Sequence, residues 1–470
     1  MLKLIIKNSF IYGLIPQISK VASFFVLPLI TPFLTKNDYG VIGVLDVYIG
    51  LFSALQFLGF NVVITNSIIN HPQHYKMIWR QLYGFLLIWS IIYIIILGLV
   101  IYFTIPDEAA SNVNEIILLK LLPEFLFAPI VLFVSTYYRM NQLAWAIASR
   151  SLLTGLIAVI LNYYLIAVLK LGFMGWIYSG FVTSLIGGLM FLYPFIFKLK
   201  LFPMFNFKIK IIKRALKIGL PVIPHNYSHY LLNSSDRLIM ERYNVSTGNI
   251  GVYSLSYTLG MYINIVANAV NQAISPNLLV FVKENKWRDF EKLVNLFQSI
   301  MFLICIIASI WVTDWMPLLI KNVELNNYPE LFVIIALSYS GWPLYAGCFS
   351  VLFYKEKTSM LWKITTLAGI INLILNIILI PFFGFTVAAW TTLFAMLFQS
   401  FSGFFYKQYK ENSNANLYPF FWFFMVLMGL YISIYSIDKG IIFKFCSSIF
   451  FLIIVFGFII KKVDLTKSFN

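Results

Sequence analysis

The chain has 470 residues, of which 60% are hydrophobic, 18% are aromatic and only 11% are charged. Because soluble domains carry about a quarter charged residues, this composition excludes a soluble globular protein and makes lipid the solvent of the chain. The 34 Lys and Arg exceed the 18 Asp and Glu and leave a net charge of +16. In a membrane protein this excess is typical of basic cytoplasmic loops beside anionic lipid, and not of nucleic-acid binding.

Fourteen segments are long and apolar enough to cross a bilayer, since a spanning helix needs roughly 20 mostly apolar residues. Their apolar runs are continuous, whereas strands of a membrane barrel alternate between apolar and polar residues, so we predict helices throughout. The expected fold is an all-α polytopic membrane protein. Its predicted spans are 10–34, 41–65, 82–105, 116–137, 146–169, 172–196, 218–240, 251–280, 293–314, 329–354, 361–381, 385–406, 417–437 and 442–460.

The distribution of Lys and Arg predicts the orientation of these spans. With the N-terminus inside, 25 basic residues fall in inner segments and 7 in outer segments or at their helix edges. Because basic loops remain in the cytoplasm, we expect both termini to be cytoplasmic.

No feature of the sequence indicates an enzyme. The loops are too short for a soluble catalytic domain, and the motifs GxxxxGK[ST], HExxH and GxSxG are absent from the sequence. The three cysteines, Cys305, Cys348 and Cys446, lie in apolar runs without metal-ligand spacing. We therefore expect no catalytic residue, no cofactor and no bound metal.

The longest predicted loop, 197–217, divides the chain into six spans before it and six after it, followed by two more. The motif Gly13-Leu14-Ile15-Pro16 corresponds to Gly219-Leu220-Pro221, and a second pair of motifs follows at nearly the same offset. An even number of intervening spans predicts a parallel repeat of two bundles. We expect four parts. They are an N-terminal six-helix lobe (1–196), a basic cytoplasmic linker (197–217), a C-terminal six-helix lobe (218–406), and two additional helices with a cytoplasmic tail (407–470).

Basic residues and Phe or Ile interleave along the linker 197–217. This pattern favours an interfacial segment that lies on anionic headgroups.

A lysine near the middle of the first span is the first candidate for a binding role. Ionisable residues deep in a span cost roughly 2.5–3.5 kcal/mol each, so they usually face a cavity or a partner. Lys20 shares one helix face with Gly13 and Gln17. Two interpretations stay open: Lys20 pairs with Asp46 or Glu124, or Lys20 and Gln17 face an aqueous cavity and bind substrate.

The seventh span is the most polar, and its polar groups fit an arc of about 120° on a helix. We expect this face to line water and bind substrate. Asp236 and Arg237 also fit the outer end of the helix, and that alternative stays open. Metal binding by the histidines is not expected, because no third ligand is evident. The residues of the arc are His225, Asn226, His229, Asn233, Asp236 and Arg237.

Amides at helical spacing mark two further spans. The eighth span presents Asn264, Asn268 and Asn271 on one face, which fits either substrate binding in a cavity or hydrogen bonding between helices. For Asn372 and Asn376 in the eleventh span, hydrogen bonding between helices is favoured.

Three carboxylates in predicted spans are candidates for coupling transport to H⁺ or Na⁺. Glu124 is the best placed of them, since it lies well inside the fourth span. A salt bridge to Lys20 would oppose such a role. Asp46 and Asp236 are the other two expected ion-coupling residues.

Four short motifs carry a resemblance to a known family. They are LTKNDYG at 34–40, GLPVIP at 219–224, SDR at 235–237 and IGVYS at 250–254. With these motifs the chain resembles, over residues 5–410, the Wzx-like polysaccharide-unit flippases of the multidrug/oligosaccharidyl-lipid/polysaccharide (MOP) exporter superfamily.

The resemblance implies a function and its partners. Such flippases move undecaprenyl-diphosphate-linked oligosaccharides from the inner to the outer leaflet of the bacterial cytoplasmic membrane, by alternating access of two six-helix lobes, for surface polysaccharides such as O-antigen. The expected partners are the lipid-linked oligosaccharide, membrane lipids and H⁺ or Na⁺. A diphosphate needs cationic donors, which Lys20, His225, His229 and Arg237 supply, while the prenyl tail stays in lipid.

The main alternative is a cation-coupled multidrug or small-molecule exporter of the same superfamily. A cavity for cationic drugs should show carboxylates in the first spans, whereas here the first span carries Lys20. A polysaccharide polymerase or ligase would resemble proteins with one long periplasmic loop that holds arginines, and the sequence has no such loop.

Overall fold

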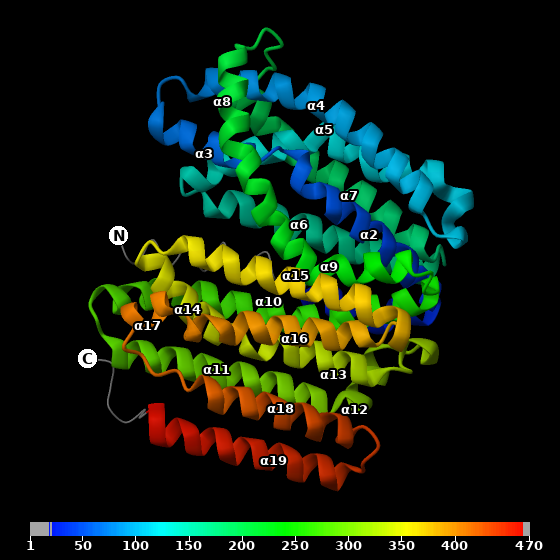
Figure 1. Ribbon diagram of the computed structural model, residues 1–470. Helices are drawn as coiled ribbons and strands as arrows, with labels where there is room; N and C mark the ends of the chain where they lie inside the picture. Colours follow the sequence, from blue (N-terminus) through cyan, green and yellow to red (C-terminus); the bar gives the residue numbers. More distant parts are fainter. Residues whose placement is uncertain (1–17, 19–20, 464–470) are drawn as a thin grey trace. The chain divides into compact units, whose positions relative to one another are not determined.

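The computed structural model describes residue 18 and residues 21–463, and in that part of the chain every regular element is a helix (Figure 1). Long unbroken helices follow from the composition, because lipid offers no partners for free backbone N–H and C=O groups. The prediction of an all-α polytopic membrane protein is confirmed.

The helices follow one another with short connections. In the first half they are α2 (Lys36–Gln56), α3 (Phe60–Asn70), α4 (Tyr75–Thr104), α5 (Val113–Met140), α6 (Ala144–Asn162), α7 (Phe173–Tyr193) and α8 (Ile209–Gly219). In the second half they are α9 (Ile223–Arg242), α10 (Thr247–Lys283), α11 (Trp287–Ile310), α12 (Val312–Leu319), α13 (Pro329–Ser338), α14 (Trp342–Tyr354), α15 (Thr358–Phe383), α16 (Val387–Ser402), α17 (Lys407–Asn412), α18 (Pro419–Ser436) and α19 (Ile441–Phe458).

Twelve helical segments among the described residues are long and apolar enough to cross a membrane, and each coincides with one of the predicted spans. Of the other two predicted spans, 218–240 corresponds to α9, whose many polar side chains keep it out of this set. The other is the first predicted span, 10–34, which lies partly outside the described residues. Its described part includes an apolar helix at Val21–Phe33. The twelve segments are Lys36–Asn70, Tyr75–Thr104, Asp107–Met140, Ala144–Val168, Phe173–Leu199, Thr247–Lys283, Trp287–Ile310, Pro329–Tyr354, Met360–Phe383, Val387–Phe405, Pro419–Ser436 and Ile441–Lys462.

The chain forms two compact units, Met1–Tyr230 and Leu231–Asn470. Their boundary falls within α9 and not in the basic segment 197–217. The reason is that the basic segment packs onto helices of the first unit. The division of the chain into a linker and two six-helix lobes stays a prediction.

In the first unit, α5 packs against α4, α6 and α7. The approach of α5 to α7 depends on Gly188, where a Cβ atom would lie 2.1 Å from the ring of Phe127. The buried Trp79 of α4 donates its indole N–H to the Ser67 hydroxyl at 2.7 Å and so joins α4 to α3. These contacts make the first unit a tightly packed bundle around α5.

The turn that carries the first family motif has a structural role. Thr35 and Asp38 form a reciprocal capping box at the start of α2, which satisfies N–H groups that a helix start leaves without partners. The second oxygen of Asp38 accepts the backbone N–H of Phe173 at 2.7 Å. The motif therefore ties the first turn of α2 to the first turn of α7.

The basic segment is attached to the beginning of α4 along its length. The backbone N–H of Met204 donates to the carbonyl of Arg80 at 3.0 Å, and Arg80 Nε donates to the carbonyl of Phe202 at 3.0 Å. The N–H of Lys208 donates to Gln81 Oε1 at 2.8 Å. Together these hydrogen bonds fix the segment on the first unit.

Two glycines allow the C-terminus of α8 to touch the turn before α3. A Cβ at Gly219 would lie 2.2 Å from the carbonyl oxygen of Leu58, and a Cβ at Gly59 would lie 2.1 Å from the carbonyl oxygen of Gly219. Gly59 also has φ +71°, which L-residues rarely adopt. The GLP motif at 219–221 therefore needs its glycine for backbone packing.

We expect Gly219→Ala to lower the free energy of unfolding by about 1–3 kcal/mol, because the added methyl group meets backbone that cannot turn away as a side chain does. Thermal unfolding of the purified protein in detergent measures this loss. Gly180→Ala is the matched control, since nothing lies within 4 Å of a Cβ there. An equal midpoint for Gly219→Ala and wild type would contradict the close contact.

In the second unit, α11 packs against α10, α13, α14, α18 and α19, and Figure 1 shows α18 and α19 running alongside it. The buried Lys444 of α19 donates to Asp314 at 2.5 Å and to Thr313 at 2.6 Å. This ion pair joins α19 to α12. The two additional helices of the sequence analysis are thus packed against α11 in the second unit.

Candidate functional site

The polar helix α9 carries an acidic residue into the interior of the second unit. Asp236 is only 1% exposed. One of its oxygens accepts the backbone N–H of Arg237 at 2.8 Å and lies 3.6 Å from Arg237 Nε, and the other accepts the hydroxyl of Tyr253. A carboxylate so deeply buried requires these partners to offset the loss of water.

Arg237 lies among aromatic rings of α10. Its guanidinium carbon is 4.5 Å from the ring centroid of Tyr257 and 6.0 Å from that of Tyr253, so cation–π attraction supplements the pairing with Asp236. Arg237 Nη2 donates to the carbonyl of Asn233 at 3.0 Å, and the Tyr257 hydroxyl donates to Asn233 Oδ1 at 3.0 Å. Asn233, Asp236 and Arg237 are therefore joined in one network.

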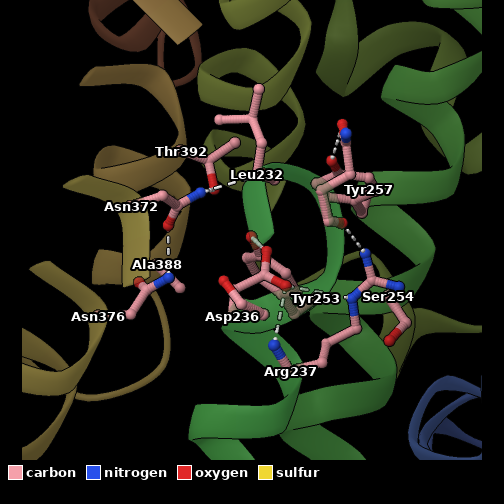
Figure 2. A network of polar contacts seen from close by, with 12 residues as sticks. Leu232, Asp236, Arg237, Tyr253, Ser254, Tyr257, Asn372, Asn376, Ala388 and Thr392 are labelled. Carbon is pink, nitrogen blue, oxygen red and sulfur yellow. Dashed lines mark hydrogen bonds and ion pairs between the residues drawn. The ribbon is translucent and has the colours of Figure 1, made fainter. Parts of the chain in front are cut away.

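A second set of buried amides and hydroxyls adjoins this network in Figure 2. Asn372 Nδ2 donates to the carbonyl of Leu232 at 3.1 Å and contacts Thr392 Oγ1 at 3.3 Å, and Asn376 Nδ2 donates to Asn372 Oδ1 at 2.5 Å. The Tyr253 hydroxyl of α10 donates to Asp236 of α9. Helices α9, α10, α15 and α16 thus share one buried polar network.

The predicted role of Asn372 and Asn376 in hydrogen bonding between helices is confirmed by these contacts. We expect Asn372→Ala to lower the free energy of unfolding by about 1–3 kcal/mol, because the Leu232 carbonyl and the Asn376 amide lose a partner in the interior. Asn264→Ala is the control, since its side chain is only partly buried. Thermal unfolding in detergent compares the two variants, and equal midpoints would contradict a special role for the buried amide.

The first unit contains a cavity of about 700 Å³ between the end of α2 and helices α5, α6 and α7. This volume falls within the roughly 300–1,000 Å³ that small-molecule sites occupy. Its polar lining combines one carboxylate, one guanidinium, one amide and several hydroxyls, and aromatic rings, aliphatic side chains and glycines line the rest. The polar residues are Gln56, Glu124, Ser135, Arg150, Ser151, Thr154, Thr183 and Ser184.

Arg150 is held in this cavity by carbonyl groups and rings. Its Nη1 donates to the carbonyl of Ala146 at 2.5 Å and its Nε to that of Met190 at 3.3 Å. The guanidinium carbon lies 5.2 Å from the ring centroid of Tyr138 and 5.4 Å from that of Phe191. Among the residues that the structure describes, no carboxylate forms an ion pair with Arg150. Its guanidinium group is therefore available to an anion, while Glu124, the carboxylate in the same lining, accepts a hydrogen bond from Gln56.

The two carboxylates predicted in the first unit have different surroundings. Glu124 lines the cavity and accepts the side-chain amide of Gln56 at 2.7 Å. Asp46 lies 3.9 Å from Lys120 Nζ, and its side chain is 58% exposed. Glu124 is thus the acidic residue that shares a cavity with Arg150.

The predicted residues of the eighth span lie on α10 and are partly buried. Asn268 Nδ2 donates to Asn264 Oδ1 at 3.0 Å, a contact within the same helix. Asn271 lies one turn further along α10. Whether this stripe binds substrate stays a prediction.

Five predicted binding residues cannot be placed at the level of their side chains. Gln17 and Lys20 lie outside the described residues. The backbone of the other three is part of α9, while their side chains lie outside what the structure describes; they are His225, Asn226 and His229.

Sequence reasoning missed Arg150 and the tyrosines of α10. Arg150 falls inside the predicted span 146–169, and a charged residue inside a span is the signal in the sequence that could have indicated it. Tyr253 is part of the IGVYS motif at 250–254. Its pairing with Asp236 has no signal in the sequence, because it depends on the packing of α10 against α9.

The described part of the chain is thus an all-helical polytopic membrane protein with twelve segments long and apolar enough to cross a membrane, a buried carboxylate network and a cavity that contains Arg150. The model of the family described as polysaccharide biosynthesis protein matches residues 5–280. The chain therefore belongs to the polysaccharide biosynthesis protein family, and the resemblance seen in its motifs is confirmed.

Solved structures with the same fold include a lipid II flippase and a MATE transporter. The lipid II flippase MurJ, in an inward closed conformation, has a TM-score of 0.71 at 13% identity, over 97% of this chain and 99% of its own. A mutant of the Vibrio cholerae MATE transporter VcmN has a TM-score of 0.58 at 15% identity, over 87% of this chain and 96% of its own. At these identities the likeness shows a common fold. No curated protein matches the sequence.

Proposed function

We propose that this chain is a flippase, not an enzyme, that moves an undecaprenyl-diphosphate-linked oligosaccharide from the inner to the outer leaflet of the bacterial cytoplasmic membrane for surface polysaccharide assembly, such as that of O-antigen in lipopolysaccharide. Membership of the polysaccharide biosynthesis protein family and the fold shared with a lipid II flippase support the proposal. The observation that carries it is the cavity of the first unit, where Arg150 has no carboxylate partner among the described residues.

The chemistry of the cavity suits a sugar diphosphate. A guanidinium binds phosphate oxygens through two parallel charge-assisted hydrogen bonds, and Arg150 is held ready for this by two carbonyls and two rings. Hydroxyls such as those of Thr154 and Thr183 then meet the sugar. The prenyl tail remains in lipid.

The cavity lies near the ends of α2, α5, α6 and α7 that the basic loops assign to the cytoplasmic side. A substrate made in the cytoplasm enters at this side. In the proposed topology both termini are cytoplasmic, and transport alternates the access of the lobes 1–196 and 218–406. Lys20 and Gln17, the polar arc of α9 and the stripe of Asn264, Asn268 and Asn271 contribute further contacts to the substrate.

Coupling to H⁺ or Na⁺ is assigned to carboxylates inside the membrane. Asp236 is the principal one, because a cation that binds its carboxylate competes with Arg237 and Tyr253 and so changes the network between α9 and α10. Glu124 and Asp46 are the further candidates, and Glu124 shares its cavity with the proposed substrate.

Deletion of the gene in its bacterium tests the function. The deletion strain should lose surface polysaccharide and accumulate the lipid-linked oligosaccharide on the cytoplasmic side, and wild-type protein from a plasmid should reverse both effects. If the deletion strain keeps its polysaccharide and instead becomes sensitive to cationic drugs, the exporter alternative replaces the flippase.

A further inference from the structure

The helix α8 in the basic segment has two opposite faces. Ile212, Ala215 and Gly219 are buried, and the first two belong to an apolar cluster that includes residues of α3. The opposite face is exposed and entirely cationic, at the helical spacing i, i+3, i+4 and i+7. It consists of Lys210, Lys213, Arg214 and Lys217.

The charge of this face is not balanced within the first unit. Residues 197–219 contain no Asp or Glu, and in the described part of the chain none of the four cations forms an ion pair with a carboxylate. Like charges three and four residues apart on a helix repel one another. The face is therefore destabilising unless anions from outside the chain cover it.

Apolar side chains flank the cationic face. Phe202, Phe205 and Ile209 are 53%, 60% and 66% exposed, which is unfavourable in water and favourable in the interfacial layer of a bilayer. The hydrogen bonds to Arg80 and Gln81 at the start of α4 hold this part of the segment in place. Both ends of the segment continue into predicted membrane spans, at Leu199 and through η5 (Leu220–Val222) into α9.

We infer that the exposed face of α8 binds the anionic headgroups of phospholipids in the cytoplasmic leaflet, with Phe202, Phe205 and Ile209 inserted beside them. Each basic residue near an anionic surface raises binding roughly fivefold, so four of them give a strong preference for anionic over zwitterionic lipid. The bound headgroups hold α8, and with it the beginning of α9, at a fixed depth in the membrane. A soluble phosphate compound would neutralise the charge but offers nothing to the exposed rings.

The test uses the purified full-length chain in detergent, to which phosphatidylglycerol or phosphatidylcholine is added. Native mass spectrometry counts the lipids retained, and thermal unfolding verifies that each variant folds. The variant that replaces Lys210, Lys213, Arg214 and Lys217 by Gln removes the face. A control variant replaces four exposed lysines outside α8 by Gln and therefore has the same net charge; they are Lys357, Lys407, Lys410 and Lys461.

We expect wild type and the control variant to retain phosphatidylglycerol at least tenfold better than phosphatidylcholine, and the α8 variant to lose this preference. A third variant, with the three lysines of the face replaced by Arg, should keep it, and it covers the case in which the Gln variant fails to fold. An unchanged preference in a folded Gln variant, or a preference lost in the Arg variant, would overturn the inference.

A second arm distinguishes lipid from free phosphate. Sodium pyrophosphate at millimolar concentration should leave the bound phosphatidylglycerol in place. If pyrophosphate removes the lipid from wild type as completely as the Gln substitutions do, the face is a site for soluble anions and the inference is wrong. Neither arm measures transport, so the outcome is independent of the proposed function.

Discussion

Asp236→Asn is expected to stop transport completely while the protein remains in the membrane. Asparagine keeps the shape of the side chain and most of its hydrogen bonds. It carries no negative charge, however, so it can neither take up and release a proton nor bind a cation as a carboxylate does. Transport of the lipid-linked oligosaccharide into proteoliposomes, driven by an H⁺ or Na⁺ gradient, measures the effect. Asp107→Asn, at an exposed acidic residue of the first unit, is the control and should transport like wild type.

The same substitution should also destabilise the second unit. Removing one partner of a buried ion pair costs about 3–5 kcal/mol, and we expect the lower end because the Arg237 side chain remains 12% exposed. The double variant Asp236→Asn/Arg237→Gln should recover part of this stability and none of the transport. If Asp236→Asn transports at the wild-type rate, Asp236 is a structural residue and the coupling site lies elsewhere.

Arg150→Gln is expected to weaken substrate binding roughly tenfold to a hundredfold, because hydrogen bonds to charged groups contribute about 1.5–3 kcal/mol. The loss should appear in the substrate concentration needed for half-maximal transport. Arg150→Lys should restore only part of the affinity, since an ammonium group keeps the charge but not the planar pair of donors.

A matched control for Arg150 is available on α5. Arg139→Gln removes an exposed arginine that does not line the cavity and whose Nη2 contacts Thr136 at 3.4 Å. It should leave the half-maximal substrate concentration unchanged. Equal behaviour of the Arg139 and Arg150 variants would show that the cavity of the first unit does not hold the diphosphate.

The sequence predicted the parts of the fold that follow from transfer of side chains between water and lipid. Continuous apolar runs marked the spanning helices, and the polar arc marked α9, because a membrane penalises every exposed polar group. The boundary of the two units was not predictable in this way. It depends on hydrogen bonds between the basic segment and α4, and on the contact of Gly219 with Leu58, all of which join residues distant in the sequence.

Three polar residues of the network on α9 were singled out in the sequence, but their partners on the neighbouring helix were not. Asn233, Asp236 and Arg237 were expected on one face of a helix, and the structure joins them through Tyr253 and Tyr257 of the next helix. Helical periodicity shows which side chains share a face, but it does not show which partner helix covers that face.

For Arg150, the residue itself was not singled out in the sequence, and its surroundings in the structure identify it. Its charge is visible in the sequence, but Arg150 lies close to the end of a predicted span, where basic residues of cytoplasmic loops are common. Only the packing of α5 and α7 around it, with Tyr138 and Phe191 on its guanidinium group, distinguishes it from an ordinary basic residue of a cytoplasmic loop.

Reconstitution tests most directly whether the chain moves a lipid-linked oligosaccharide across the bilayer. Purified protein is placed in liposomes that contain the undecaprenyl-diphosphate oligosaccharide from its bacterium, and a membrane-impermeant glycosidase reports which molecules reach the outer surface. We predict that wild-type protein exposes substrate from the inner leaflet to the enzyme, and that liposomes with Asp236→Asn behave like protein-free liposomes. If wild-type protein leaves the inner-leaflet oligosaccharide protected under every ion gradient, yet exports a small cationic dye, the chain is not a flippase of this substrate class.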